Sequence, residues 1–223
     1  MDAVIKVGGS VLQKNSVKDL CKSLDKLIKK FSFVILPGGG AFANLVRNYY
    51  KIYQNSDDSA HWMAILSENI LGFLILEYLE LGKPVFSVSE ISEILNSSQI
   101  PIFMPFQYIF EQDPLPHSWK VTSDSIAAYL AEILQAKKLI LLKDVDGIYT
   151  RDPKKFPSEE IKLIPLINLK TAELSNFYNC IDSYLPILLK KYQRDCFIVN
   201  GFHPERLTQV LHNEKSIYTK IIL

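Results

Sequence analysis

The alternation of short apolar runs with helical patterns most constrains how this chain can fold. Residues 3–7 and 33–36 are short aliphatic or β-branched runs, and glycines follow them at 8–9 and at 38–40. A pattern with apolar residues at helical spacing comes after the first run. Strands that alternate with helices through short loops form a parallel sheet covered on both faces. We therefore predict an α/β fold, a three-layer αβα sandwich with a mostly parallel central sheet.

The same pattern places further elements along the chain. Ser16 is the expected N-cap of the first helix, and Asp57 and Asp58 are the expected caps of a long helix that ends before Gly82. Helices are expected over residues 16–30, 41–53, 59–81 and 122–135, and strands over 84–88, 100–104, 138–143, 195–200 and 219–223. In open parallel sheets ligands bind beyond the carboxyl ends of the strands, which is where the glycine-rich loops fall.

Composition narrows the function classes. The 223 residues are 48% hydrophobic and include 25 lysines and arginines against 24 acidic residues, a formal net charge of +1. A chain so close to neutral has no global attraction to nucleic acid or to an anionic membrane, so a bound anion must be held by local groups. Its most apolar stretch, residues 70–76, is too short to span a bilayer. We expect no nucleic-acid partner and no membrane association.

The cysteines indicate the compartment. Cys21, Cys180 and Cys196 are far apart and form no CxxC pair. An odd number without metal-ligand spacing is typical of buried thiols in a reducing compartment. The sequence also runs directly into the first predicted strand without a signal-peptide pattern. These features predict a soluble cytoplasmic protein.

The first glycine-rich loop follows Lys6. Glycines directly after a strand let backbone N–H groups approach an anion closely, and Lys6, two residues before Gly8, can add a point charge. A tight strand–helix turn with a lysine at the strand edge would have the same sequence. The loop is not a Walker A loop, because no GxxxxGK[ST] pattern occurs in the chain. Gly8, Gly9 and Ser10 are therefore candidate phosphate-binding residues.

Three consecutive glycines, Gly38, Gly39 and Gly40, follow the second strand. They cost conformational entropy that an ordinary turn does not require. They also open onto a predicted helix, whose N-terminus can hold a phosphate. Two such strand ends so close in sequence favour a site that holds phosphates from two directions over two ordinary tight turns.

Two later segments place carboxylates next to predicted elements. Thr122 or Ser123 can cap the helix that begins there, with Asp124 in its first turn. The loop 143–153 begins with Lys143 at the end of an apolar run and contains several acidic residues. A solvated Asp-Gly turn explains this loop. The same groups are also those expected around a nucleotide ribose and its phosphates.

In this order the segments resemble the amino-acid kinase superfamily, which includes acetylglutamate, aspartate, uridylate and isopentenyl phosphate kinases. The resemblance rests on V-I-K-V-G-G-S (4–10), L-P-G-G-G (36–40), T-S-D-S-I-A-A-Y-L-A (122–131), L-L-K-D-V-D-G-I-Y-T-R-D-P (141–153), I-V-N-G-F-H-P-E-R-L (198–207) and Y-T-K-I-I (218–222). It covers nearly the whole chain. Within the superfamily, residues 115–125 are most similar to the aminomethylfuran phosphate kinase branch of methanofuran biosynthesis.

The resemblance implies transfer of the γ-phosphoryl group of ATP to an acceptor, with Mg²⁺ bridging the nucleotide phosphates and no side chain of this protein assigned as a metal ligand. Lys6 matches the family's catalytic lysine, and Asp124 matches the carboxylate that orients the catalytic lysines. The first glycine loop matches the one that contacts the nucleotide phosphates, and the triple glycine matches the acceptor loop. The nucleotide pocket is expected to be shaped by Asp144, Asp146, Gly147, Tyr149 and Asp152.

One departure from the family pattern concerns a second lysine. Many members carry a G-G-M-x-x-K segment in the last third, but residues 180–187 of this chain read C-I-D-S-Y-L-P-I and contain no lysine. Lys143 is the natural substitute, because it ends a predicted strand of the sheet and the uridylate kinases have a lysine at the start of the corresponding loop. A plain strand-end lysine is the alternative.

Other residues are expected on the acceptor side. Arg47 could reach an acceptor phosphate or be a solvated residue on its helix. His117 and Ser118, with the neighbouring Trp119, could contact a furan ring by stacking and hydrogen bonding, or form an ordinary buried loop. Thr122 is a further candidate for substrate binding. Residues 61–63 are expected to serve packing or a subunit interface.

The leading hypothesis is an ATP-dependent kinase that converts a phosphomonoester to a diphosphate, with [5-(aminomethyl)furan-3-yl]methyl phosphate as the specific acceptor. The alternatives are uridylate, isopentenyl phosphate or a carboxylate as acceptor, and a nucleotide-binding sensor or storage protein without turnover. Residues 1–223 are expected to form one domain, with an acceptor lobe over roughly 1–120 and a nucleotide lobe over roughly 121–223. Because family members are often oligomers, we expect a homo-oligomer, with the helix predicted over 59–81 as its candidate surface.

Overall fold

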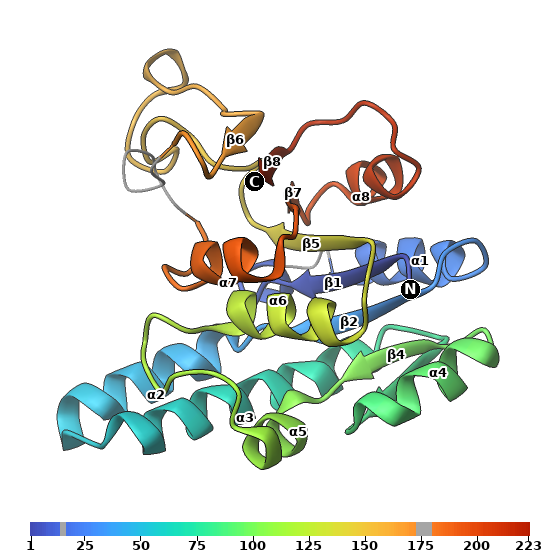
Figure 1. The fold of residues 1–223 in the computed structure, drawn as a ribbon, viewed down its shortest axis with the longest axis vertical. Coiled ribbons are helices and arrows are strands. Elements are labelled where there is room, and N and C mark those ends of the chain that lie inside the picture. The colour runs from blue at the N-terminus through green and yellow to red at the C-terminus, as the bar shows by residue number, and fades with distance from the viewer. Residues whose placement is uncertain (14–16, 173–179) are drawn as a thin grey trace.

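The computed structural model describes residues 1–13, 17–172 and 180–223. Within these ranges the strands are β1 (Ala3–Val7), β2 (Phe33–Pro37), β3 (Gly82–Val85), β4 (Ile100–Phe103), β5 (Lys138–Lys143), β6 (Leu166–Asn168), β7 (Cys196–Asn200) and β8 (Thr219–Ile222). They form one sheet in the order β3-β4-β2-β1-β5-β7-β8-β6 (Figure 1). All neighbouring strands pair in parallel except β7 and β8, which are antiparallel.

Helices cover both faces of this sheet. The helices are α1 (Val17–Leu27), α2 (Gly40–Tyr53), α3 (Asp57–Leu76), α4 (Val88–Asn96), α5 (Pro105–Gln112), α6 (Ser123–Ile133), α7 (Leu185–Tyr192) and α8 (Pro204–Leu211), with 3-10 turns η1 (Val11–Gln13) and η2 (Ser158–Glu160). Side chains alternate along β5, so that Leu139 and Leu141 pack with α6 and α7, whereas Ile140 and Leu142 pack with α1 and α8. The predicted three-layer αβα sandwich is confirmed.

The cysteines lie within these layers. Cys21 and Cys196 are buried on opposite faces of the sheet, Cys180 is half-buried, and all three are free thiols. Burial raises the pKa of Cys21 to about 12, so that thiol is unreactive at neutral pH.

The predicted third helix was wrong at both ends. Ser56 is its N-cap and accepts a hydrogen bond from the backbone N–H of Ser59, whereas the expected caps at residues 57 and 58 lie in the first turn. The helix ends at Leu76 rather than near 81, because Asp25 of α1 accepts hydrogen bonds from the backbone N–H groups of Glu80 and Leu81. A contact between distant segments therefore replaces the last helical turn.

Some elements were shifted or missed. The strand expected over 84–88 is β3, Gly82–Val85, and the helix α4 begins at its expected end. Ser87 Oγ donates to Glu90, which also accepts from the backbone N–H of Phe86, so the S-V-S-E sequence starts a helix. Helix α5 and strand β6 were also not predicted. The first helix begins at Val17 as described, and its expected cap Ser16 lies outside the described residues.

Within the described ranges, α3 is the one helix long and apolar enough to cross a membrane by length and composition. Its most apolar window is 44% buried inside the protein, and the helix packs against α2, α5 and β2. Figure 1 shows α2 and α3 lying side by side. A core helix of a soluble protein meets the same criteria of length and composition.

Candidate active site

Two lysines share one buried carboxylate at the carboxyl edge of the sheet. Lys6 lies on β1 and Lys143 ends β5, and the parallel pairing of these strands brings both side chains to the same edge. Lys6 Nζ lies 2.9 Å from Asp124 Oδ1, and Lys143 Nζ lies 2.8 Å and 2.6 Å from the two carboxylate oxygens. The three residues are 5%, 8% and 2% exposed in the order Lys6, Lys143, Asp124. When all three are ionised, a net positive charge remains for an anion.

The charges of this cluster depend on one another. Burial opposes ionisation of Asp124, but Lys143 and Lys6 outweigh it and hold the pKa of that carboxyl well below its usual range. Burial also opposes the charge of Lys143, yet Asp124 raises the pKa of that lysine. For Lys6 burial prevails and its pKa is lowered. A phosphate beside Lys6 would therefore favour its charged form.

The two glycine loops are in backbone contact above the cluster. A Cβ on Gly9 would lie 2.2 Å from the Cα and N of Gly40, so a larger residue at Gly9 would separate the loops. Gly40 has a φ of +52°, which suits glycine at the start of α2. The backbone N–H of Gly38 donates to the carbonyl of Val7 at 2.8 Å and joins the second loop to the end of β1.

A cavity of about 420 Å³ opens between these loops and the start of α6. It brings together several predicted site residues: Lys6, Gly9, Ser10, Gly39, Gly40, Arg47, Thr122 and Lys143. Asn44, Glu68 and Trp119 also line it, and of these Asn44 and Glu68 were not singled out from the sequence. Arg47 lies over the Trp119 ring, with its guanidinium carbon 4.6 Å from the ring centroid. The volume and mixed lining suit a small phosphorylated molecule.

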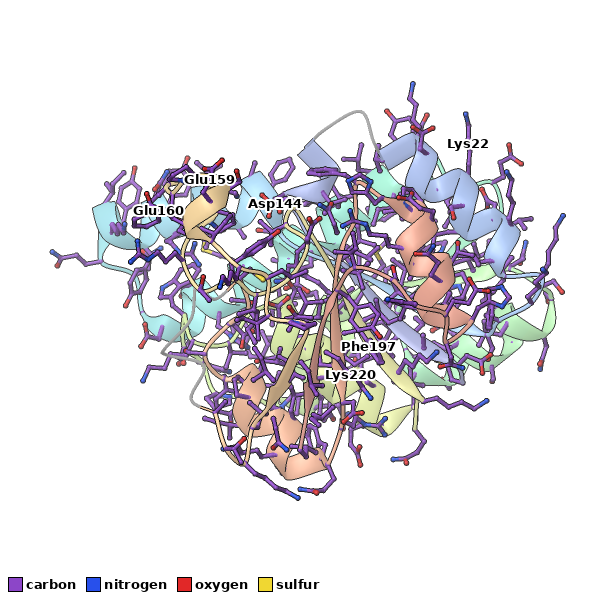
Figure 2. The ribbon with its side chains drawn as sticks, turned by 90° about the horizontal axis from the view of Figure 1, so that it is seen from above. Lys22, Asp144, Glu159, Glu160, Phe197 and Lys220 are labelled. Carbon is purple, nitrogen blue, oxygen red and sulfur yellow. The ribbon has the colours of Figure 1, made fainter. Side chains whose placement is uncertain are left out.

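The predicted nucleotide segment lies outside this cavity's lining, in the loop after β5. Asp144 forms an ion pair with Lys154 at 2.6 Å. Burial opposes its ionisation, but Lys154 prevails and its pKa is lowered. Asp146 accepts hydrogen bonds from Asn200 at 2.8 Å, from Arg206 and from Tyr149 at 3.3 Å, and the remaining predicted residues, Gly147 and Asp152, belong to the same loop. In Figure 2 Asp144 lies on the same side of the molecule as Glu159 and Glu160 of η2.

Asp182 organises the start of two helices, and sequence reasoning missed it. Its carboxylate accepts hydrogen bonds from the backbone N–H and hydroxyl of Thr122, from the same groups of Ser125, and from the backbone N–H groups of Tyr184 and Leu185. Its own backbone N–H donates to Asp124 at 3.2 Å. An acidic residue just before a helix with proline in its first turn was the available signal.

We expect Asp182→Ala to lower the free energy of unfolding by about 3 kcal/mol, because buried N–H and hydroxyl donors lose their acceptor. For a chain of this length the melting temperature falls by about 6–12 °C. Chemical denaturation of both proteins checks this. Glu214→Ala, at an exposed position after α8, is the control, and equal unfolding free energies for the two variants would contradict the role of Asp182.

His117 does not line the cavity, and it contacts two acidic residues. Its Nδ1 is 2.6 Å from Asp58 and its Nε2 is 2.8 Å from Asp113, and its ring stacks on His61 with 4.4 Å between centroids. His117 is not among the residues that line the cavity, whereas the adjacent Ser118 lines a narrow recess beside it. The expected contact between His117 and a furan ring therefore remains a prediction, because His117 is not among the residues that line the cavity.

Stability should depend on pH through His117. Burial opposes its charge, but Asp58 and Asp113 prevail and its pKa is raised. The stabilisation is complete below the unfolded pKa of about 6.5 and is lost as the pH rises through the folded value. We expect His117→Gln to cost about 1 kcal/mol at pH 6 and less at pH 9, since both acidic partners are largely solvated.

Denaturation curves at the two pH values measure this difference, with the more exposed His203→Gln as the control. A cost for His117→Gln that grows from pH 6 to pH 9 would contradict the assignment. His61 does not interfere, because burial and the His117 charge lower the pKa of His61 to about 4.

A parallel α/β sheet with two glycine loops and paired lysines at its carboxyl edge has the groups that phosphoryl transfer needs, namely backbone amides and positive charge around phosphates. These features define a phosphotransferase. Residues 1–184 match the model of the Amino acid kinase family, and the chain belongs to that family.

Named relatives agree with this assignment. The chain is 34% identical over 223 residues to the [5-(aminomethyl)furan-3-yl]methyl phosphate kinase of Methanocaldococcus jannaschii, covering 98% of this chain and 97% of that protein. It is 25% identical to the uridylate kinase of Methanococcoides burtonii, over 95% and 91% of the two chains. The crystal structure of UMP kinase from Ureaplasma parvum superposes with a TM-score of 0.76 at 20% identity, over 100% and 99% of the chains, and shares the fold.

Proposed function

We propose that this protein is an ATP-dependent kinase that phosphorylates [5-(aminomethyl)furan-3-yl]methyl phosphate to the diphosphate, a step of methanofuran biosynthesis. The observation that carries the proposal is the 34% identity, over nearly the full length of both chains, to a kinase of that name. The cavity supports it, because Lys6 and Arg47 offer positive charge and Trp119 offers an aromatic face in one space.

The proposed reaction is an in-line displacement. An oxygen of the acceptor phosphate forms a bond to the γ-phosphorus of ATP, and the bond from that phosphorus to the β–γ bridging oxygen breaks, so that ADP leaves. Lys6 and Lys143 neutralise the charge that builds up on the transferred group, and Asp124 holds both ammonium groups in position. The backbone of the two glycine loops positions the phosphates on either side. In this proposal the acceptor lies in the lobe of roughly 1–120 and the nucleotide in the lobe of roughly 121–223.

Mg²⁺ is proposed to accompany the nucleotide. Across residues 1–13, 17–172 and 180–223, no three His, Cys, Asp or Glu side chains gather closely enough to hold a metal ion. Mg²⁺ commonly keeps several waters and binds through substrate phosphates. We assign no step of the transfer to it.

The test is a coupled assay for ADP release with Mg²⁺, ATP and a panel of acceptors: [5-(aminomethyl)furan-3-yl]methyl phosphate, uridylate, isopentenyl phosphate, aspartate and acetylglutamate. Selective turnover of the furan phosphate is expected. Selective turnover of another acceptor would assign the protein to a different branch of the family. Tight ATP binding without turnover of any acceptor would indicate a sensor or storage protein.

A soluble cytoplasmic homo-oligomer is part of the proposal. Helices α2 and α3 expose several large apolar side chains: Phe42, Leu45, Tyr49, Ile52, Tyr53, Leu66, Ile70 and Phe73. Several exposed apolar side chains on two neighbouring helices are typical of a surface that binds another protein chain, and we propose a second copy. Sedimentation velocity is expected to show at least a dimer, and a monomer at micromolar concentration would contradict it.

A further inference from the structure

A narrow recess adjoins the cavity at Glu68 and Trp119, which line both spaces. Its volume of about 20 Å³ accommodates one water-sized group. The cavity has room for the body of an acceptor, whereas the recess can admit only a small terminal group. His61 of α3 also lines the recess. No residue of the two glycine loops is among the residues that line it.

Three residues that line this recess have buried polar atoms without partners. Within the described part of the chain, four buried side-chain polar atoms lack a hydrogen-bond partner, and three of them belong to recess residues: His61 Nε2, Glu68 Oε2 and Trp119 Nε1. Such atoms are costly to bury, so a group that satisfies them would bind favourably. Because Glu68 is 4% exposed and His61 is 7% exposed, bulk water does not satisfy them.

Glu68 is not needed by the lysine cluster. Lys6 forms its ion pair with Asp124 and acts on Glu68 only through its charge. Burial raises the pKa of Glu68 well above its usual value, and Lys6 offsets this only in part. Burial therefore favours the protonated form of this carboxyl group. A cation in the recess would offset the cost of burying the negative charge and favour the carboxylate.

We propose that the recess binds the ammonium group of the acceptor, with the Glu68 carboxylate as its counter-charge. This inference rests on the proposed function, whose acceptor carries an aminomethyl group. An ammonium group is close to a water molecule in size, and its N–H groups can donate to Glu68 and to a neutral His61. The indole N–H of Trp119 can donate to the ring oxygen of a furan. The acceptor phosphate then extends into the cavity toward Lys6 and Arg47.

Binding should release a proton. A protonated Glu68 must lose its proton when the ammonium group binds in the recess. The ammonium group of the acceptor itself stays protonated. Isothermal titration calorimetry in two buffers of different ionisation enthalpy measures the number released. We use the aminomethyl phosphate and an analogue in which a methyl group replaces the aminomethyl group.

For the wild-type protein we expect the aminomethyl compound to bind about a hundredfold more tightly than the methyl analogue, since the analogue leaves the buried carboxyl unpaired. Because burial raises the pKa of Glu68, binding of the aminomethyl compound is also expected to release protons at pH 7. In Glu68→Gln both compounds bind equally, the analogue binds as it does to the wild type, and no proton is released. KM for the aminomethyl compound rises while kcat changes little.

Glu93→Gln, on the exposed side of α4, is the matched control and should leave both results unchanged. Glu68→Met repeats the test should the glutamine variant unfold. The inference is overturned if Glu68→Gln keeps the preference and the proton release, or if it weakens both compounds equally. If the wild type phosphorylates the furan phosphate and Glu68→Gln gives one of these two results, this inference alone is overturned. If the wild type neither binds nor phosphorylates that compound, the proposed function is overturned as well.

Discussion

Replacing Lys6 with alanine is expected to lower kcat by about a hundredfold or more while leaving the melting temperature nearly unchanged. The ammonium group of Lys6 lies at the cavity surface, where it can neutralise the transferred phosphoryl group. Its loss does not expose a buried charge, because Asp124 remains paired with Lys143 at 2.6 Å. Activity and stability should therefore separate in this variant.

Steady-state kinetics and a thermal melt of the same preparation measure both quantities. Lys6→Met, which keeps most of the side-chain volume, should behave as the alanine variant does if charge is the cause. Lys137→Ala is the control, since its ammonium group is on the surface and pairs with Asp2. Turnover like that of the wild type in Lys6→Ala would remove this residue from the mechanism.

Replacing Asp124 with asparagine is expected to reduce both activity and stability. Two buried lysines would lose the counter-charge that holds their ammonium groups. Removing one partner of a buried ion pair typically costs about 3–5 kcal/mol. Lys6, whose pKa burial already lowers, would then lose more of its charge. We expect kcat to fall by about a thousandfold and the melting temperature by about 6–20 °C.

The pH dependence of this loss identifies its cause. The folded pKa of Asp124 is depressed, so its stabilisation is present above the unfolded pKa of about 3.9 and is lost as the pH falls through the folded value. The difference between wild type and Asp124→Asn should thus be constant from about pH 5 to 8 and shrink only in strong acid. Denaturation curves measure it, with Asp195→Asn at a partly exposed ion pair as the control. A loss confined to activity would show that Asp124 does not stabilise the fold.

The local pattern of apolar and capping residues was sufficient to predict much of the fold. The runs 3–7, 33–36 and 138–143 form strands as predicted, because each is apolar enough to be buried on both faces of a parallel sheet. Thr122 caps its helix as its sequence indicates. By contrast, the end of α3 depends on Asp25, which is more than fifty residues away along the chain. No local window contains that information.

Some features of the candidate site could likewise be predicted from the local sequence, whereas others depend on contacts between distant segments. By itself the sequence determined most of the strands, the glycine loops and the lysine that ends β5, because strand periodicity and glycine at strand ends are local properties of the chain. Only the tertiary structure decided that Lys143 shares Asp124 with Lys6, that Asp182 supports both helices beside it, and that Glu68 faces a recess. In the sequence, Glu68 is an acidic residue within an apolar helix, and its spacing does not mark it as a site residue. Its burial and its missing partner arise from side chains that the fold brings together from distant segments, and such contacts have no signature in the spacing of residues.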